Sequence, residues 1–172
     1  MNIDNLSVID YNDPILHDPC ERWDFLNPAF DIVEYSQNLV NKMLELNGLG
    51  LSSNQVGVPY KIFAMRADPN LVVVNPRIIE VSDEMVTLEE GCLSYPGLIV
   101  KVKRPLWIKA RFNYPNGQAG TYRFEGMTAR VFLHEFDHIE FGHTFMDQAN
   151  SIHREKAKKN WKLLQRKRKA YA

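Results

Sequence analysis

The sequence predicts an α+β protein in which antiparallel β-sheets pack around a central helix, with a long helix before them and a basic helix at the C-terminus. Short segments rich in β-branched and aromatic residues cluster between residues 60 and 124, and helical patterns precede and follow this cluster. Strands and helices do not alternate along the chain, as they would in a protein built on a parallel sheet.

The length and composition predict one globular domain over residues 1–172. A hydrophobic fraction of 45% and a charged fraction of 24% exclude a disordered chain. No apolar run reaches the roughly 20 residues that a membrane helix needs, so we expect no membrane partner. The N-terminal residues lack the pattern of a signal peptide, and two cysteines are too few for a disulfide framework. We therefore expect a cytoplasmic protein.

The N-terminal third predicts an irregular segment followed by a long helix. Asp13-Pro14 and Asp18-Pro19 interrupt any regular element in the first 26 residues. Asn27-Pro28 is typical of a helix cap followed by the first helical position, and apolar residues then recur every three or four residues up to Asn47-Gly48. The apolar stripe of this helix is interpreted as core.

The glycine-rich segment 48–57 is predicted to be an extended loop that approaches a ligand closely. Its glycines and serines leave backbone N–H and C=O groups accessible. It lacks the Lys-Ser/Thr pair of a phosphate-binding loop, and it follows a helix, whereas a dinucleotide-binding loop follows a strand. Gln55 is its candidate functional side chain.

The middle of the chain predicts seven short strands. Segments 99–103 and 107–112 alternate apolar and charged residues, which indicates antiparallel strands with one solvated face. Turn sequences such as Asp68-Pro69-Asn70 separate the segments. The predicted strands are 60–65, 71–75, 77–81, 85–88, 98–103, 106–114 and 121–124.

The motif His134-Glu135-Phe136-Asp137-His138 lies in a predicted helix from Met127 to Phe141. A spacing of four residues places both imidazoles on one helix face, where they can bind one metal ion. Glu135 can then accept a proton from a water that the metal polarises. Two histidines on a partly buried helix can also occur by chance. A catalytic metal usually has three protein ligands, so the motif requires a third.

Cys92 is the candidate for this third ligand. It lies between Gly91 and the turn sequence Ser94-Tyr95-Pro96-Gly97, and a thiolate with two histidines forms a tetrahedral set with one open position. A structural thiol and an unpaired nucleophile remain alternatives for an isolated cysteine in a loop.

Three blocks in the same order resemble the motifs of the peptide deformylases. GLGLSSNQVG (48–57) is similar to the glycine-rich motif of that family, EGCLSYPG (90–97) to its E-G-C-L-S motif, and HEFDH (134–138) to its H-E-x-D-H motif. The resemblance covers about residues 10–150. It differs at Ser52-Ser53, where the family usually has two alanines, and buried serine hydroxyls require hydrogen-bond partners.

The resemblance implies a mechanism and a cofactor. Cys92, His134 and His138 would bind a divalent metal, with Fe²⁺ expected and Zn²⁺, Ni²⁺ or Co²⁺ able to substitute. Glu135 would act as general base and then general acid, and Gln55 with the backbone N–H of Leu93 would form the oxyanion hole. The implied reaction is hydrolysis of the N-formyl group from the formyl-methionine of nascent peptides, which releases formate. The residues implied to surround the substrate are Leu49, Gly50, Leu88, Glu90, Gly91, Met127, Arg130 and Val131.

Two alternatives come from other classes. A zincin-type metallopeptidase would need a third His or Glu ligand after His138, but Glu140 and His143 do not complete that motif. The other alternative is a non-catalytic adaptor that binds RNA or the ribosome, with a relict metal site.

The C-terminal segment 150–172 is predicted to be a basic helix. It contains nine Lys or Arg residues and one acidic residue, a net charge of +8; the chain is neutral, so residues 1–149 have −8. Ile152, Ala157, Trp161 and Leu164 are predicted to form a narrow apolar stripe. A solvated helix end is one interpretation. The other, which we adopt, is a helix that binds ribosomal RNA through phosphates and contributes little to the chemistry.

Overall fold

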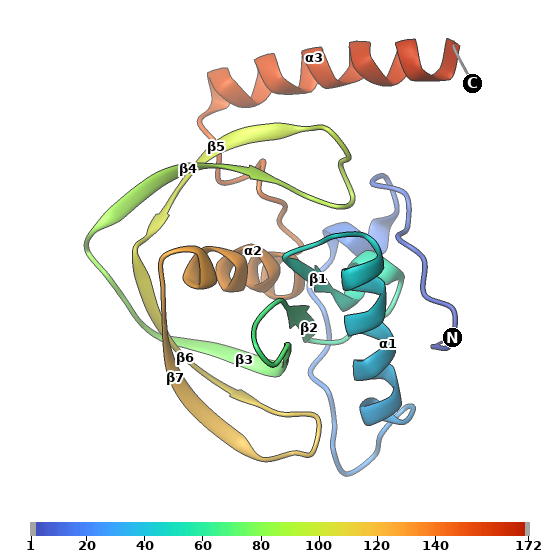
Figure 1. Cartoon of the computed structure of the whole chain (residues 1–172), viewed down its shortest axis with the longest axis vertical. Helices are drawn as coiled ribbons and strands as arrows, with labels where there is room; N and C mark the ends of the chain where they lie inside the picture. The colour runs from blue at the N-terminus through green and yellow to red at the C-terminus, as the bar shows by residue number, and fades with distance from the viewer. Residues whose placement is uncertain (1–2, 171–172) are drawn as a thin grey trace.

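The computed structural model describes the backbone of residues 3–170 and the side chains of residues 3–166, so the predicted contributions of the Lys167, Arg168 and Lys169 side chains lie outside the described part. Figure 1 shows the elements and their order along the chain. They are the 3₁₀-helix η1 (Pro14–His17), α1 (Ile32–Glu45), β1 (Gly50–Ser52), the 3₁₀-helix η2 (Ser53–Val56), β2 (Ile62–Met65), β3 (Leu71–Val81), β4 (Met85–Gly91), β5 (Ile99–Pro105), β6 (Trp107–Asn113), β7 (Ala119–Glu125), α2 (Met127–Phe141) and α3 (Ser151–Ala170).

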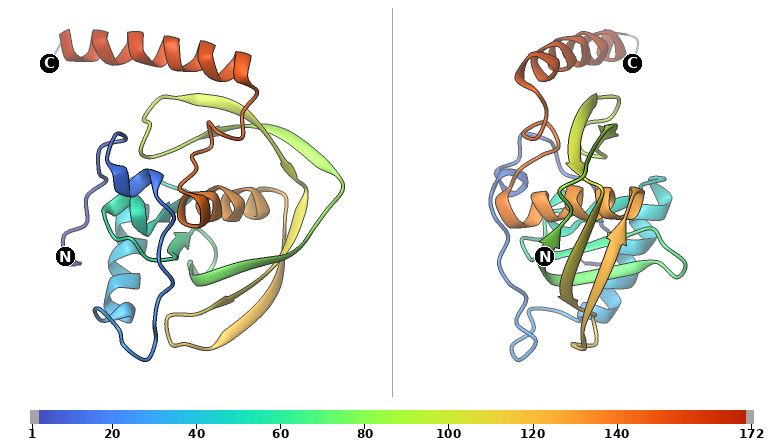
Figure 2. Two further views of the ribbon diagram at one scale, coloured as in Figure 1. Left: turned by 180° about the vertical axis from the view of Figure 1, so that it is seen from behind. Right: turned by 90° about the vertical axis from the view of Figure 1, so that its left-hand side faces the viewer.

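The strands form two antiparallel sheets. The larger sheet has the order β1-β2-β3-β6-β7, and β4 pairs with β5 in the smaller one. The strands curve around α2, while α1 lies on the other side of β1 and β2 (Figures 1 and 2). This is the α+β class with antiparallel sheets that the sequence predicts. None of the helices in residues 3–170 combines the length and apolar character needed to cross a bilayer.

The apolar face of α2 packs on the larger sheet. The ring of Phe132 lies 5.0 Å from that of Phe63 and 4.9 Å from that of Phe124, measured between centroids. Burial of such side chains contributes roughly 1.5–3 kcal/mol each relative to exposure. The opposite face of α2 points toward β4, β5 and the loop between them. This second face bears the two motif histidines, His134 and His138.

Several strands begin or end one to three residues away from the prediction, and two larger differences have a clear structural cause. Helix α1 begins at Ile32, not at Pro28, because the Asp31 side chain accepts the N–H groups of Val33 and Glu34 at 2.8 and 3.1 Å. The predicted strands 71–75 and 77–81 are one strand, β3, with a register shift between Val74 and Arg77. Asn75 takes a positive φ at this bulge, and its side-chain amide bonds to both the N–H and the C=O of Trp23.

The glycine-rich segment is also more ordered than predicted. Gly50–Ser52 forms the edge strand β1 paired with β2, and Ser53–Val56 forms η2. The hydroxyls of Ser52 and Ser53 both have hydrogen-bond partners, which buried serines need when they stand where the family usually has alanines. Ser52 Oγ lies 2.8 Å from Asn54 Oδ1 and 3.0 Å from Gln55 Oε1, and Ser53 Oγ donates to the carbonyl of Tyr60.

Helix α3, Ser151–Ala170, lies within the predicted segment 150–172, but its predicted apolar stripe is wrong in part. Ile152 is 76% exposed and Leu164 50%, whereas Trp161 is only 5% exposed and Ala157 is half-buried. Helix α3 lies at the outside of the molecule, next to the β4–β5 pair (Figure 2), so residues on the side of the helix that faces away from this pair remain in solvent.

Candidate metal centre and active site

Three side chains from two distant segments meet at one point beside α2. His134 and His138 lie one helical turn apart, and the centroids of their rings are 5.1 Å apart. Cys92 joins them from the loop that follows β4. One ligand atom from each residue lies within 4.8 Å of the others, which is the arrangement expected of three ligands around one metal ion.

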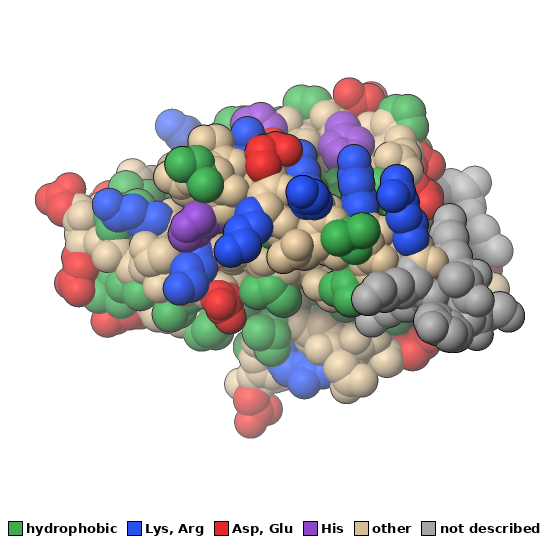
Figure 3. Space-filling model, turned by 90° about the horizontal axis from the view of Figure 1, so that it is seen from above, with side chains coloured by type: hydrophobic (Ala, Val, Ile, Leu, Met, Phe, Trp, Pro, Cys, Tyr) green, Lys and Arg blue, Asp and Glu red, His purple; other side chains and the backbone are tan. Residues whose placement is uncertain are grey.

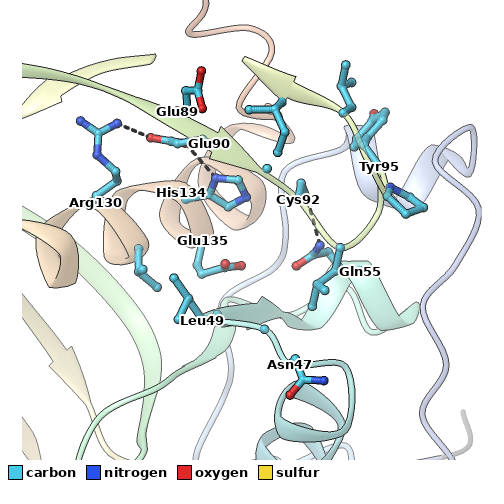
Figure 4. Close-up of a pocket in the computed structure, with 18 of the residues that line it drawn as sticks. Asn47, Leu49, Gln55, Glu89, Glu90, Cys92, Tyr95, Arg130, His134 and Glu135 are labelled. Atoms are coloured by element: carbon cyan, nitrogen blue, oxygen red, sulfur yellow. Dashed lines mark hydrogen bonds and ion pairs between the residues drawn. The ribbon is translucent and has the colours of Figure 1, made fainter. Parts of the chain in front are cut away.

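The loop between β4 and β5 holds Cys92 in place. The N–H of Tyr95 donates to the carbonyl of Cys92 at 2.9 Å and closes a tight turn. The thiol sulfur lies 3.3 Å from His138 Nε2, and it accepts a hydrogen bond from Gln55 Nε2 at 3.3 Å. Figure 4 shows Gln55 pointing at Cys92 from the opposite wall. The Gln55 amide therefore faces the same space as the proposed ligands.

A buried carboxylate, Glu90, orients His134. Glu90 accepts hydrogen bonds from His134 Nδ1 at 3.0 Å, Arg104 Nε at 2.6 Å and Arg130 Nη1 at 2.7 Å. Burial alone would raise the pKa of Glu90, but the hydrogen bonds from His134 and Arg104 lower it to about 2. Because Nδ1 of His134 is engaged, its Nε2 is the nitrogen left for a metal.

Arg104 and Asp137 belong to the same network and were not among the predicted site residues. Arg104 Nη1 donates to Asp137 Oδ2 at 2.8 Å, so one guanidinium bridges Glu90 and the helix that bears both histidines. The sequence contained a signal for it. Val100, Val102 and Arg104 occupy the inward positions of the alternating strand β5, and an arginine at an inward position requires a buried partner.

Replacing Arg104 by methionine should lower the free energy of unfolding by about 3–5 kcal/mol, because Glu90 and Asp137 would remain buried with less compensation for their charges. Urea denaturation measures this change. Lys103→Met is the matched control, since Lys103 is the neighbouring exposed residue of β5. Equal, small losses for both variants would show that the ion network contributes little to stability.

Glu135 lies beside the cluster without belonging to it. Its carboxylate is buried, and its Oε2 has no hydrogen-bond partner within the described residues. Burial raises the pKa of Glu135 to about 7, and the neighbouring His134 partly opposes this shift. The Glu135 side chain fits against β1 only because residue 50 is glycine: a Cβ on Gly50 would lie 2.8 Å from the carboxyl carbon. A buried carboxyl with one oxygen left without a hydrogen-bond partner is suited to exchange a proton with a bound molecule.

The two histidines have opposite electrostatic environments. Burial would lower the pKa of His134, but hydrogen bonds to Cys92 and Glu90 raise it to about 10. Burial and the nearby charge of His134 lower the pKa of His138 well below its usual value. Nδ1 of His138 is buried without a partner in the described part of the chain. A thiolate and two imidazole nitrogens are a donor set for Zn²⁺ or Fe²⁺, so these residues fit a metal ion.

A cavity of about 440 Å³ opens onto this centre (Figure 4). It brings together Cys92, Gln55, Leu93, His134 and Glu135. Of the residues predicted to surround the substrate, seven line the cavity: Leu49, Gly50, Glu90, Gly91, Met127, Arg130 and Val131.

Three of the predicted substrate residues are poorly placed to contact a substrate through their side chains. Leu88 is 42% exposed and is not among the residues that line this cavity. Glu90 and Arg130 line it, but both are buried and their charged groups pair with each other. The cavity lining also includes Tyr95, Pro96, Gly97, Leu98 and Ile99, which the sequence did not indicate as site residues.

The fold and the centre together define a class, the metal-dependent hydrolases, because two of the three potential metal ligands, Cys92 and His134, line a cavity that is also lined by the buried carboxyl group of Glu135. Comparison with known protein families identifies the family within this class. The chain belongs to the polypeptide deformylase family, whose model matches residues 5–155. A peptide deformylase of Desulforudis audaxviator is 35% identical over 152 residues, which are 87% of this chain and 96% of the relative.

Other relatives agree. A peptide deformylase of Aquifex aeolicus is 32% identical over 169 residues, covering 94% of this chain and 98% of the relative. Among solved structures, Arabidopsis thaliana peptide deformylase 1B with an inhibitor has a TM-score of 0.84 at 28% identity, covering 97% of this chain and 94% of that one. A Synechococcus elongatus peptide deformylase with actinonin has a TM-score of 0.83 at 26% identity, covering 90% and 86%. The similarity therefore extends over nearly the whole chain.

Proposed function

We propose that this protein is a peptide deformylase that hydrolyses the N-formyl group from the formyl-methionine of newly made polypeptides and releases formate. The single observation that carries the proposal is the meeting of Cys92, His134 and His138 beside the buried Glu135, in a chain of the deformylase family. Newly made polypeptides emerge in the cytoplasm, which is the compartment proposed. Residues 1–172 are proposed to form one catalytic domain, with α3 attached to its surface.

Cys92, His134 and His138 are the residues that would hold the metal. When bound, a divalent metal ion would polarise a water molecule and the formyl oxygen. Fe²⁺ is the proposed native ion, because a thiolate with imidazole ligands suits it, and Zn²⁺, Ni²⁺ and Co²⁺ are proposed to substitute. Glu90 supports this set by fixing His134 through Nδ1.

Glu135 is assigned the proton transfers. Its raised pKa allows it to accept a proton from the attacking water and to give it to the leaving amine. The side-chain amide of Gln55 and the backbone N–H of Leu93 are assigned to stabilise the charge that develops on the formyl oxygen. Removal of one such donor commonly costs roughly 10²–10³ in turnover.

The cavity is assigned to the methionine side chain and the first peptide units. Leu49 and Met127 are about half exposed, and they offer apolar surface at the cavity wall. Apolar contacts of this kind discriminate weakly, since one methylene is worth about 1–3 kcal/mol. The remaining proposed substrate contacts are Gly50, Leu88, Glu90, Gly91, Arg130 and Val131.

The alternatives are not favoured. A zincin-type peptidase would need Glu140 or His143 as the third ligand. Glu140 instead pairs with Lys61 at 2.7 Å, and the described residues that could hold a metal include Cys92 rather than His143. A non-catalytic adaptor would not need the buried Glu135 beside the cluster, and the family match favours an enzyme.

The experiment that tests the proposal is a deformylation assay. The metal-loaded protein should release formate from formyl-Met-Ala-Ser and leave acetyl-Met-Ala-Ser intact. Internal peptide cleavage without formate release would instead support a peptidase. No turnover of either substrate would overturn the proposed enzymatic function.

The proposed second partner is ribosomal RNA, bound through the outer face of α3. Lys156, Lys159, Lys162 and Arg166 are exposed on this helix. Figure 3, viewed from above, shows Lys and Arg side chains crowded on this surface, with apolar side chains between them. Phosphates are the complementary charge, and an enzyme that acts on nascent chains gains from binding where they emerge.

Neutralising two of these charges, with Lys156→Gln and Lys159→Gln together, should weaken co-sedimentation with ribosomes, most clearly at low salt. The effect arises because fewer counterions are released on binding. Arg77→Gln with Arg111→Gln is the matched control: it removes the same charge from exposed positions of β3 and β6. If both double variants sediment like the parent, these helix charges do not bind the ribosome.

A further inference from the structure

Helix α3 makes a direct contact with the loop that contains Cys92 and Leu93. The indole N–H of Trp161 donates to the carbonyl of Pro96 at 2.9 Å, and the Gln165 amide donates to the same oxygen at 3.2 Å. Pro96 lies in the turn between β4 and β5, four residues after Cys92. A single carbonyl thus accepts two hydrogen bonds from a helix that is otherwise largely exposed.

Aromatic side chains extend this contact toward the metal centre. Trp161 packs on Tyr11 and Tyr95, with ring centroids 4.9 and 5.8 Å apart. Tyr95 contacts Phe145 at 6.0 Å, and Phe145 contacts His134 at 5.7 Å. A continuous set of packed rings therefore joins α3 to a proposed metal ligand.

The contacted loop forms one wall of the active-site cavity. Residues Leu93 and Tyr95 through Leu98 line that cavity, and Cys92 precedes them. From inside the protein the loop is held by Gln55, whose amide donates to Ser94 Oγ at 3.0 Å. From outside it is held by Trp161 and Gln165. The side chains of Tyr95 and Leu98 are buried, so packing also holds the loop. Local opening becomes easier when supporting contacts are removed, so loss of the Trp161 contact should loosen the loop.

We infer that Trp161 is a positioning residue for deformylation: it holds residues 92–98 so that Cys92 and the Leu93 N–H stay aligned with the substrate. This inference rests on the proposed function, and it revises the expectation that the C-terminal helix contributes little to the chemistry. A displacement of about 1 Å at a reacting geometry can cost 10²-fold in rate. The inner face of α3 therefore serves the active site, while the outer face remains free for a partner.

The test compares three variants of the full chain. Trp161→Ala removes the ring and the N–H donor. The double variant Trp161→Phe with Gln165→Ala keeps an aromatic ring but removes both donors to the Pro96 oxygen. Leu163→Ala is the matched control, because Leu163 lies two residues away on the same helix and is 48% exposed.

We expect kcat on formyl-Met-Ala-Ser to fall by roughly 10-fold or more in Trp161→Ala. Amide hydrogen exchange across residues 92–98 should rise, relative to peptides from α2 that report global opening. The double variant should show both changes to a smaller extent, and Leu163→Ala should match the parent. If Trp161→Ala does not fold, kcat and hydrogen exchange of the double variant decide whether the contact with Pro96 holds the loop.

Unchanged exchange across 92–98 and unchanged kcat in the variants that lose the Pro96 contact would overturn the inference. Exchange that rises equally in 92–98 and in α2 would also overturn it, because Trp161 would then act only on global stability. Hydrogen exchange needs no turnover, so an inactive parent would count against the proposed function while the exchange result still decides whether Trp161 holds the loop.

Discussion

Glu135→Ala is expected to abolish nearly all deformylation while the protein keeps as much metal as the parent. Glu135 is buried next to the cluster, but the candidate ligands are Cys92, His134 and His138. Loss of a general base and acid commonly costs roughly 10²–10⁴-fold in rate. Formate release measures the activity, and metal analysis of the purified variant measures the stoichiometry.

Glu140→Ala is the matched control for this prediction, because Glu140 lies on the same helix and pairs with Lys61 away from the cluster. It should retain the activity of the parent. If Glu135→Ala loses its metal, Glu135 is itself a ligand and the assignment of its role is wrong. Substantial remaining activity with metal bound would show that another group moves the proton.

Cys92→Ser is expected to lose the metal or bind it much more weakly. The thiolate is the soft donor of the set, and a serine hydroxyl does not ionise near neutral pH to replace it. Metal content after dialysis measures the loss. Cys20→Ala is the control: Cys20 is buried under α2, and burial raises its pKa to about 12, so it remains a thiol and should not affect metal binding.

A further prediction concerns the native metal bound by Cys92. If iron is bound through Cys92, peroxide should inactivate the Fe²⁺ form much faster than the Ni²⁺ form, because iron promotes oxidation at a thiolate. Activity against time in peroxide, measured for both metal forms, checks this expectation. Equal rates for the two forms would argue against a redox-active iron–thiolate centre.

Local patterns predicted many elements well, since their signals come from neighbouring residues. The helix Met127–Phe141 has the predicted bounds, because its apolar positions repeat at the helical period up to the glycine that ends it. Strand β5 alternates as predicted for the same reason. The start of α1 was wrong because Asn27 and Asp31 are both good caps, and only packing decides between them.

The sequence predicted the candidate metal ligands, but not the hydrogen bonds that hold them in position. The motif H-E-x-x-H and the motif around Cys92 indicated the candidate ligands, since both residue types bind metals and both motifs resemble those of one family. The partners of Glu90 were not predicted, because its contacts with Arg104 and Arg130 span 14 and 40 residues. Resemblance instead implied that Glu90 and Arg130 contact substrate.

The sequence by itself determined the α+β class, the helix with its two histidines and the charge of the C-terminal helix. These properties depend on residue type and on spacings of two to four residues. The regular geometry of a helix or strand places side chains at such spacings on the same face of that element. Tertiary structure alone decided that Cys92 reaches His138 across 46 residues and that Trp161 reaches Pro96 across 65. Such contacts depend on sheet register and on which side of α3 packs, and no local pattern encodes either.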